Sequence, residues 1–422
     1  MAENKDKKVL NVPNLRFPEF EGEWEKCKVG DFGKIITGNT PPTKDIENYE
    51  NGQYLWVSPA DLGLLKSITK TKTKLSKKGF DKTRALPAGS VLVTCIGSTI
   101  GKMGMTTRET STNQQINAIV VNKSNNNEFV YYAVQSAFPK YLSSIAVQAV
   151  PIISKSSFEL LPNYRPSIQE QEKIGRLFAL LDERIATQSK IIEKLETLIK
   201  GISNRLLYAD NSMSIRIEEM LIERSERTKK NNQYEILSST VNGIFSQRDY
   251  FSKDIASDNN VGYKIVHLHD IVLSPQNLWM GNINFNDKFD IGIVSPSYKV
   301  FSIADGFDKK YVAALLKTHH ALYNYMLVSE QGASTVRRNL NYEAFEQLVF
   351  KIPSLNKQQE IGHVISLLKS QLENANLLIK TYNSQKQYLL EGVSKCTHPL
   401  FYAQSPDFLK PGLCYFLKFL YL

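Results

Sequence analysis

Basic side chains crowd one stretch in the first third of the chain. Between positions 66 and 84 the sequence carries Lys66, Lys70, Lys72, Lys74, Lys77, Lys78, Lys82 and Arg84. Asp81 is the single acidic residue in that stretch. Such a cluster can neutralise several phosphates of a polyanion and release their counterions; the alternative is a solvated basic loop.

Amide, indole and guanidinium side chains that can pair with base edges gather in two further regions. Arg337 and Arg338, within SEQGASTVRRN, can read guanine or clamp a phosphate. For any single residue of this kind, an ordinary surface side chain is the alternative. The candidate nucleic-acid contacts are Lys70, Lys72, Lys74, Lys77, Lys78, Lys102, Asn113, Gln114, Gln148, Lys155, Gln276, Asn277, Trp279, Asn282, Ser334, Arg337, Arg338 and Asn339.

Several segments imitate catalytic motifs but miss a requirement. GSTIGKMG (97–104) lacks one residue between its glycines and has Met103 where a phosphate-binding loop needs a hydroxyl. TPPT (40–43) lacks the acidic or amide residue and the aromatic residue that hold a flipped base, so we interpret it as a turn. His267 and His269 alternate along an expected strand without a partner at ligand spacing. We assign no catalytic and no metal-binding residue, and the sequence indicates a protein that binds.

Composition agrees with a folded, polyanion-binding protein. The 422 residues are 42% hydrophobic and 22% charged, which is ordinary globular usage. The net charge is +10, and positions 1–165 carry +7 of it. The four cysteines form no C-x-x-C pair, which fits reduced thiols in a cytoplasm. No apolar run reaches about 18 residues and no signal peptide is recognised, so we expect a cytoplasmic protein without a membrane contact.

The chain resembles itself when position 153 is aligned with position 340. Between 153–181 and 340–368, ten of 29 positions are identical without a gap. Each copy contains a Pro-Ser pair, in which the serine can cap a following helix. Repeats of this kind indicate two copies of one structural unit.

A long helix follows each Pro-Ser pair. Apolar residues step by three and four along both copies, as in a helix that pairs with another helix. The alternative is two unrelated amphipathic helices on separate cores. The expected helix-pairing residues are Ile174, Leu177, Leu181, Ile191, Leu195, Leu198, Ile361, Val364, Leu368, Leu378, Tyr382 and Leu389.

The expected fold is therefore α+β and doubled. Runs 89–98 and 269–275 are rich in β-branched residues and predict buried strands. We expect two globular domains of mixed sheet and helix, each followed by a long helix, with the helices paired as an antiparallel coiled coil of pseudo-two-fold symmetry. The predicted segments are a first domain at 1–165, a helix at 166–208, a second domain at 209–352, a helix at 353–393 and an apolar tail at 394–422.

Together these features resemble the specificity (S) subunit of type I restriction-modification systems. The matching pieces are VPNLRFPEFEGEWEKCKVGDFGKIITGNTPPT, LPAGSVLVTCIGSTIGKMGM, STNQQINAIV and RPSIQEQEKIGRLFALLDERIATQSKIIEKLETLIKGI, with a diverged copy of the last at 353–392. The resemblance covers about 10–393, and the repeated Pro-led helix is its most specific part.

The resemblance implies a non-catalytic subunit with two target recognition domains. Each domain would bind one half of an asymmetric bipartite site in double-stranded DNA. Two modification subunits would dock on the helices, hold S-adenosylmethionine and methylate adenine. Restriction subunits would use ATP and Mg to translocate and cleave DNA, and no cofactor is expected on this chain itself.

Two other functions stay open at this point. One is a self-contained DNA methyltransferase or nuclease, and the other is a coiled-coil scaffold that binds protein. The chain also departs from the family in two respects: its second domain is close to neutral, and its apolar tail is longer than the usual ending.

Overall fold

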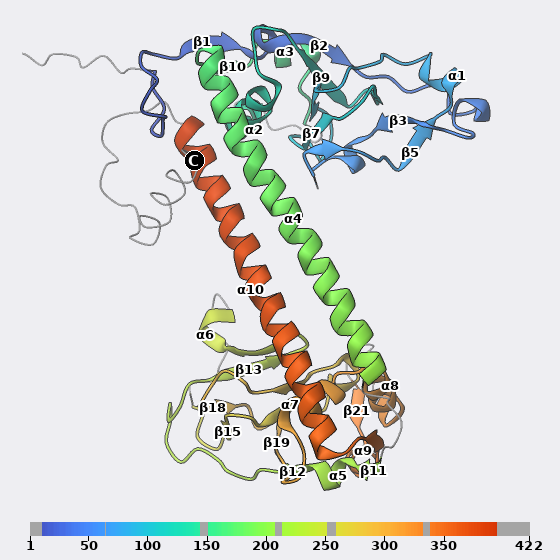
Figure 1. Cartoon of the computed structure of the whole chain (residues 1–422), viewed down its shortest axis with the longest axis vertical. Helices are drawn as coiled ribbons and strands as arrows, with labels where there is room; N and C mark the ends of the chain where they lie inside the picture. The colour runs from blue at the N-terminus through green and yellow to red at the C-terminus, as the bar shows by residue number, and fades with distance from the viewer. Residues whose placement is uncertain are drawn as a thin grey trace, which may run out of the picture. The chain divides into compact units, whose positions relative to one another are not determined.

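A computed structural model describes residues 11–63, 65–143, 151–206, 213–250, 259–331 and 338–394. The chain divides into two compact units. The first holds residues up to Thr187 and from Ile379 onward, and the second holds Gln188–Leu378. Each unit contains a sheet domain and part of both long helices, α4 (Ile168–Leu206) and α10 (Leu355–Ser394) (Figure 1). The expected mixture of helix and sheet with two long helices is confirmed.

An antiparallel sheet with one parallel edge strand forms the centre of the first unit. Its order is β2-β9-β6-β7-β4, and β6, inside the expected run 89–98, is completely buried. Its strands are β2 (Gly33–Thr37), β9 (Ile116–Val121), β6 (Val91–Thr94), β7 (Met103–Thr106) and β4 (Ser67–Ile68). The smaller pairings join β1 (Glu25–Lys28) with β10 (Pro162–Arg165), and β3 (Tyr54–Val57) with β5 (Thr73–Leu75) and β8 (Ser111–Thr112). The short helices are η1 (Val29–Phe32), η2 (Ile46–Asn48), η3 (Pro59–Asp61), α1 (Lys77–Phe80) and α3 (Lys155–Glu159), beside the longer α2 (Asn127–Ser143).

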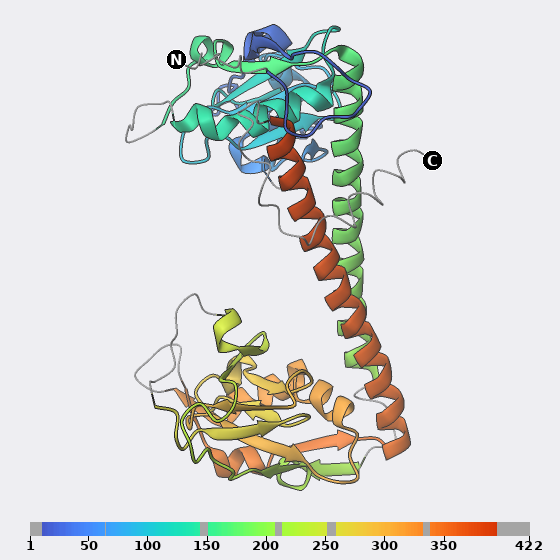
Figure 2. The same cartoon turned by 90° about the vertical axis from the view of Figure 1, so that its left-hand side faces the viewer.

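The second unit repeats this arrangement of sheet and helices with a smaller main sheet. Its main sheet has the order β12-β19-β16-β17, and β16 lies inside the expected run 269–275. The strands are β12 (Leu221–Glu223), β19 (Lys299–Ile303), β16 (Ile271–Leu273) and β17 (Ile283–Phe285). The paired strands around it are β11 (Met213–Arg216) with β22 (Val349–Ile352), β13 (Leu237–Thr240) with β14 (Gly243–Ser246), β15 (Lys264–His267) with β18 (Ile291–Val294), and β20 (Ser329–Gln331) with β21 (Arg338–Leu340). The helices, several of them visible in Figure 2, are α5 (Ile217–Met220), α6 (Gln247–Tyr250), η4 (Leu278–Met280), α7 (Lys309–Leu315), α8 (His319–Leu327) and α9 (Tyr342–Glu346).

The sheet orders show which strands correspond. The series β2-β9-β6-β7 and β12-β19-β16-β17 have the same order and the same antiparallel directions. In each unit an edge pair, β1-β10 or β11-β22, leads into the long helix. The sequence repeat, which is detectable only near the helices, therefore extends through both sheet domains.

The identical residues of the repeat hold each long helix to its domain. Gln171 Nε2 donates to the Pro166 carbonyl at 3.1 Å, and Gln358 Nε2 donates to the Pro353 carbonyl at 2.9 Å. The Oε1 atom of each glutamine accepts a backbone N–H from the residue that caps an earlier helix, Asn126 before α2 or Asp308 before α7. Because both glutamines are 1% exposed, these hydrogen bonds fix the helix where water cannot replace them.

A glycine one turn further on lets the backbones approach. A Cβ atom at Gly175 would lie 2.5 Å from Asn126 Oδ1 and 2.9 Å from Glu128 Cβ. A Cβ atom at Gly362 would lie 2.8 Å from the backbone N of Tyr311. The side-chain oxygen of Asn126 or Asp308 itself caps α2 or α7, so neither contact has room to relax.

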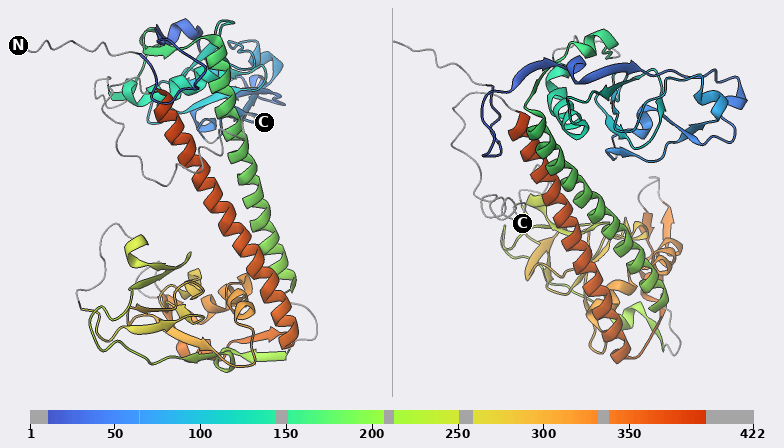
Figure 3. Two further views of the ribbon diagram at one scale, coloured as in Figure 1. Left: turned by 60° about the vertical axis from the view of Figure 1, so that its left-hand side comes forward. Right: turned by 45° about the horizontal axis from the view of Figure 1, so that its top comes forward.

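Both long helices pack side by side in each unit, with opposite directions (Figures 1 and 3). In the first unit Asp182 of α4 meets Lys386 of α10, and in the second Gln188 Nε2 donates to the Ala375 carbonyl at 3.3 Å. The residue number therefore rises along α4 as it falls along α10. None of the described helices combines the length and apolar character that a membrane span requires.

The burial of the expected helix-pairing residues is uneven. Ile174, Leu177, Leu181, Ile361 and Leu389 are buried, whereas Leu195, Leu368 and Tyr382 are partly buried. The structure exposes Ile191, Leu198, Val364 and Leu378 by 39–47%. Two residues outside the expected set, Phe178 and Ile365, are 0% and 1% exposed and are counterparts in the repeat. The helix ends are buried against the sheet domains as well as against each other, which widens the apolar stripe beyond a two-helix seam. Because each helix end packs on a different sheet domain, the boundary between the two compact units lies inside α4 and inside α10.

An ionic cluster joins the two helices to the first sheet domain. Asp182 accepts from Lys386 at 2.6 Å, from Lys66 at 3.2 Å and from the Tyr132 hydroxyl. Lys66 also contacts Glu128 at 2.7 Å. Burial raises the pKa of the Asp182 carboxyl, but Lys386, Tyr132 and Lys66 outweigh it and hold that pKa below its ordinary value.

The glycine contact predicts opposite results at two positions of α4. Gly175→Ala should lower the free energy of unfolding by about 1–3 kcal/mol, because the added methyl group overlaps the cap of α2. Gly201→Ala is the matched control: nothing lies within 4 Å of its Cβ position, so it should raise stability by about 0.5–1 kcal/mol. Urea denaturation of the full chain measures both, and equal effects would contradict the contact.

The ionic cluster predicts a specific loss of stability in acid. Because the folded pKa of Asp182 is depressed, its contribution is present above the unfolded value of about 3.9 and is lost as pH falls through the folded value. Asp182→Asn should cost about 1–3 kcal/mol at pH 7 and less at pH 3. Glu183→Gln, at the exposed neighbouring residue, should be close to neutral at both. A cost for Asp182→Asn that does not change with pH would refute the assignment.

Candidate nucleic-acid interface

Two equivalent hairpin loops carry many of the candidate contacts. The loop 95–102 joins β6 to β7, and the loop 274–282 joins β16 to β17. Lys102 is exposed at the end of the first loop, while Gln276, Asn277 and Trp279 lie on the second. Contacts predicted from the sequence therefore lie on both of these corresponding loops.

In the second unit the loop is joined by a distant segment. The backbone N–H of Arg338 donates to the Gln276 carbonyl at 3.1 Å. The Arg338 guanidinium lies over the Trp279 ring, 4.6 Å from its centroid. Asn339 is exposed on the same strand, β21. A planar cation held against an indole can stack on a base or bind two acceptors at once. Ser334 and Arg337 lie outside the described residues.

Two of the selected amides are used inside the protein. Asn282 is 4% exposed, donates to the Ser239 carbonyl at 3.0 Å and accepts from the Ser239 hydroxyl at 2.8 Å. Asn113 is 7% exposed and makes two hydrogen bonds to Gln115, one through each side-chain polar atom. These bonds position the hairpin β13-β14 and the segment that leads into β9. In this structure neither amide is presented to a partner.

In the first unit two loops meet around Asn39. The TPPT segment after it leads into a turn at Thr43 and Lys44, and its Thr40 hydroxyl donates to Gln114 Oε1 at 2.5 Å. Asn39 Nδ2 donates to the Lys82 carbonyl at 2.8 Å, and its Oδ1 accepts the Arg84 N–H at 3.1 Å. Sequence reasoning missed Asn39 as an organising residue, because it had only the turn signal of the prolines to follow. Gln114 is exposed beside this junction.

The basic stretch is less positive than its local sequence suggests. Lys78 pairs with Asp45 and Glu47, and Lys82 pairs with Asp45 at 2.9 Å. Asp81, the one acid expected, pairs with Lys77 at 2.6 Å. The expectation that Asp81 alone opposes the cluster is wrong, because the turn at η2 brings two carboxylates from a separate, upstream part of the sequence.

The remaining candidates of the first unit differ in their surroundings. Lys70, Lys72 and Lys74 are exposed, and no ion pair joins their ammonium groups to another described residue. Lys155 is exposed on α3, with Glu159 3.5 Å away. Gln148 lies outside the described residues. Lys70, Lys72, Lys74 and Lys102 are therefore the cations best placed for phosphate contacts.

The expected histidine pair does not share a strand. β15 ends at His267, whose Nε2 lies 2.9 Å from Glu226. His269 follows in a turn with a φ of 71° and stacks on Phe285. The expectation that both alternate on one strand face is wrong, because the turn interrupts the alternation. Within the described ranges no three His, Cys, Asp or Glu side chains are grouped as a metal site.

Comparison with known proteins agrees with this arrangement. Residues 21–197 match the family model of the type I restriction modification DNA specificity domain. The specificity subunit of the type I restriction enzyme HindI from Haemophilus influenzae is 30% identical over 190 residues, which cover 44% of this chain and 38% of that protein. The MjaIX specificity subunit from Methanocaldococcus jannaschii is 27% identical over 182 residues, 42% of either chain. The matched part thus spans about two fifths of the length of these relatives.

A solved structure covers more of the chain. The type I restriction-modification S subunit from M. genitalium has a TM-score of 0.63 and 14% sequence identity, and the match covers 92% of this chain and 100% of that one. Residues 21–197 are therefore similar to the type I restriction modification DNA specificity domain, and the chain has the fold of the solved type I restriction-modification S subunit. The resemblance expected from the sequence is confirmed.

Proposed function

We propose that this chain is the DNA-binding specificity subunit of a type I restriction-modification complex. The observation that carries the proposal is that two units share one strand order and present equivalent hairpin loops with polar and basic side chains. A non-palindromic DNA site in two parts requires two such surfaces with different residues. The matched specificity domain in the first unit supports the same function.

Each unit would read one half of a bipartite site. In the second unit the stacked pair Trp279 and Arg338, with Gln276 beside it, would meet base edges. In the first unit Gln114 would do so, while Lys70, Lys72 and Lys74 neutralise phosphates. The lengths of α4 and α10, 39 and 40 residues, would set the spacer between the half-sites.

The proposal assigns catalysis to partner proteins. Two modification subunits would dock on the long helices and supply S-adenosylmethionine and adenine methylation, and restriction subunits would supply ATP- and Mg-dependent cleavage. This chain would then act in the cytoplasm, where the DNA lies. The relatives that match are specificity subunits, which favours a non-catalytic role over a self-contained methyltransferase or nuclease.

The half-site assignment predicts a one-sided change in specificity. In cells that express the modification subunits, Arg338→Ala with Gln276→Ala should relax one half of the methylated motif, because each good base contact discriminates by about 1–3 kcal/mol. Lys357→Ala, on α10 where Lys357 pairs with Glu360, is the control and should leave both halves unchanged. Sequencing of methylated adenines measures the motif.

Three outcomes would count against the proposal. Relaxation of both halves would exclude modular reading. Methylation or cleavage by the purified chain alone would favour the enzyme alternative. A complete lack of sequence-dependent DNA affinity, even with modification subunits present, would favour a protein-binding scaffold.

The lysine pairing predicts a difference in salt dependence. Replacing Lys70, Lys72 and Lys74 together by Gln should reduce the slope of log affinity against log salt by about two to three, because each phosphate contact contributes about 0.9. Replacing Lys77, Lys78 and Lys82 should reduce it less, because their charges are already opposed by Asp45, Glu47 and Asp81. Titration of duplex DNA at several salt concentrations compares the two sets, and equal slopes would contradict the assignment.

A further inference from the structure

The two units place different residues at one equivalent position. Asn126 and Asp308 cap α2 and α7 in the same way, so Tyr132 and Ala314, each six residues further on, correspond. In the alignment of the two long helices that the sequence repeat defines, Asp182 of α4 corresponds to Lys369 of α10. At these two corresponding positions, the first unit has a tyrosine and an aspartate where the second unit has an alanine and a lysine.

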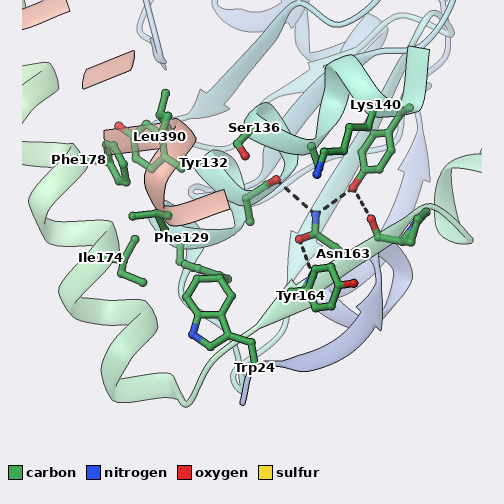
Figure 4. A pocket seen from close by; sticks show the side chains of 15 residues that line it. Trp24, Phe129, Tyr132, Ser136, Lys140, Asn163, Tyr164, Ile174, Phe178 and Leu390 are labelled. Carbon is green, nitrogen blue, oxygen red and sulfur yellow. Dashed lines mark hydrogen bonds between the residues drawn. The ribbon is translucent and has the colours of Figure 1, made fainter. Parts of the chain in front are cut away.

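In the first unit this position holds an aromatic ring. The Tyr132 ring packs on Phe178, with 4.6 Å between centroids, and both residues line a separate pocket of about 370 Å³ beside Leu390 (Figure 4). The Tyr132 hydroxyl reaches Asp182, whose charge is balanced by Lys386 and Lys66. The Asp182 carboxylate therefore lies between two lysines, one of which also pairs with Glu128.

In the second unit a pocket of about 290 Å³ lies at the equivalent position. Ala314 lines it where the tyrosine stands in the first unit, and Ile199 and Ile365 form apolar walls. Three lysines contribute to the lining: Lys200 from α4, Lys317 from the turn after α7, and Lys369 from α10. We call this cavity the lysine pocket.

The lysines of the pocket are poorly compensated. No ion pair joins any of the three to another described residue. Lys317 Nζ donates to the carbonyls of Gly281 and Val241, at 2.7 and 3.2 Å, which are neutral acceptors. Burial, with the charge of Lys369, lowers the pKa of Lys317 to about 8. Its cationic form therefore lacks a counter-charge at neutral pH.

The acids nearby do not close this gap. Glu196 lines the pocket beside His319, a further base. Glu373 pairs with Lys288 at 3.4 Å, and Asp287 and Glu373 both act on Lys369 through their longer-range field without forming an ion pair with it. Three lysines and one acid, Glu196, line this pocket, whereas the equivalent position in the first unit has a central carboxylate.

We propose that the lysine pocket binds a phosphate group, carried either by a small solute or by the DNA backbone. Lysine ammonium groups bind phosphate as point charges, and three of them from separate elements surround the cavity. Its volume of about 290 Å³ has room for a phosphate together with the small group that carries it or with ordered water. The phosphate would supply the negative charge that Asp182 supplies in the first unit.

Calorimetric titration of the full chain with inorganic phosphate tests the site without DNA, so its result does not depend on the proposed specificity function. We expect saturable binding that weakens at least tenfold in Lys369→Met. Lys380→Met, at a lysine of the same helix that is exposed like Lys369 but does not line the pocket, should bind as the wild type does. Lys369→Asp should abolish phosphate binding and raise the Tm in phosphate-free buffer, because it places a carboxylate among Lys200 and Lys317. This gain in stability separates loss of the site from misfolding.

Duplex DNA distinguishes the two sources of the phosphate. If the group belongs to the backbone, inorganic phosphate competes with DNA and Lys369→Met reduces the salt slope by about 0.9. If it belongs to a small solute, DNA affinity is the same in wild type and Lys369→Met while phosphate binding still differs. Three results would overturn the proposal. They are an absence of saturable phosphate binding by the wild type, an unchanged affinity for phosphate in Lys369→Met, and binding of acetate as tight as that of phosphate.

Discussion

The close approach of each long helix to its sheet domain is the constraint on which the structure depends. Gly175 and Gly362 allow the backbone contact, and Gln171 and Gln358 fix it with buried hydrogen bonds on both sides. A surface helix held only by apolar packing can slide or rotate by small steps. A buried amide that must meet two particular backbone groups cannot, because a shift would leave polar atoms unsatisfied at a cost of about 1–3 kcal/mol. Each domain is therefore set on its helix in one register.

Away from that junction the two copies diverge, even at positions such as Tyr132 and Ala314 that are buried in both units. Residues that hold the helix are identical because both copies need the same contact. Further along, Asp182 and Lys369 have opposite charges, and Tyr132 and Ala314 have very different volumes. A frame fixed by a few backbone contacts tolerates such exchanges if each unit balances its own charges. The first unit does so internally through Lys66 and Lys386, and the second lacks an equivalent acid among its described residues.

The repeat and the periodicity of the helices could be found from the sequence, because they depend on residue spacing alone. The two central strands, β6 and β16, were equally predictable from β-branched runs between glycine and proline. The surroundings of single polar residues were not. Asn113 and Asn282 carry amide side chains of the type that reads bases, yet the fold buries them. The carboxylates of Asp45 and Glu47 reach the lysine stretch only through the folding of η2 against α1. Such contacts join segments that lie far apart in the sequence, and no local pattern encodes them.

The positions of the exposed loops explain how one frame can present different chemistry. The loops 95–102 and 274–282 are each closed by an antiparallel pair of buried strands, so their ends are fixed while their side chains vary. In the second unit Arg338, which is distant from Trp279 in the sequence, completes the surface through a hydrogen bond from its backbone to Gln276. That bond holds whatever side chain stands at position 338. The frame therefore determines where a side chain is presented, and substitution at a few loop positions can change what it recognises without disturbing the buried glutamine and glycine contacts that hold each domain to its helix.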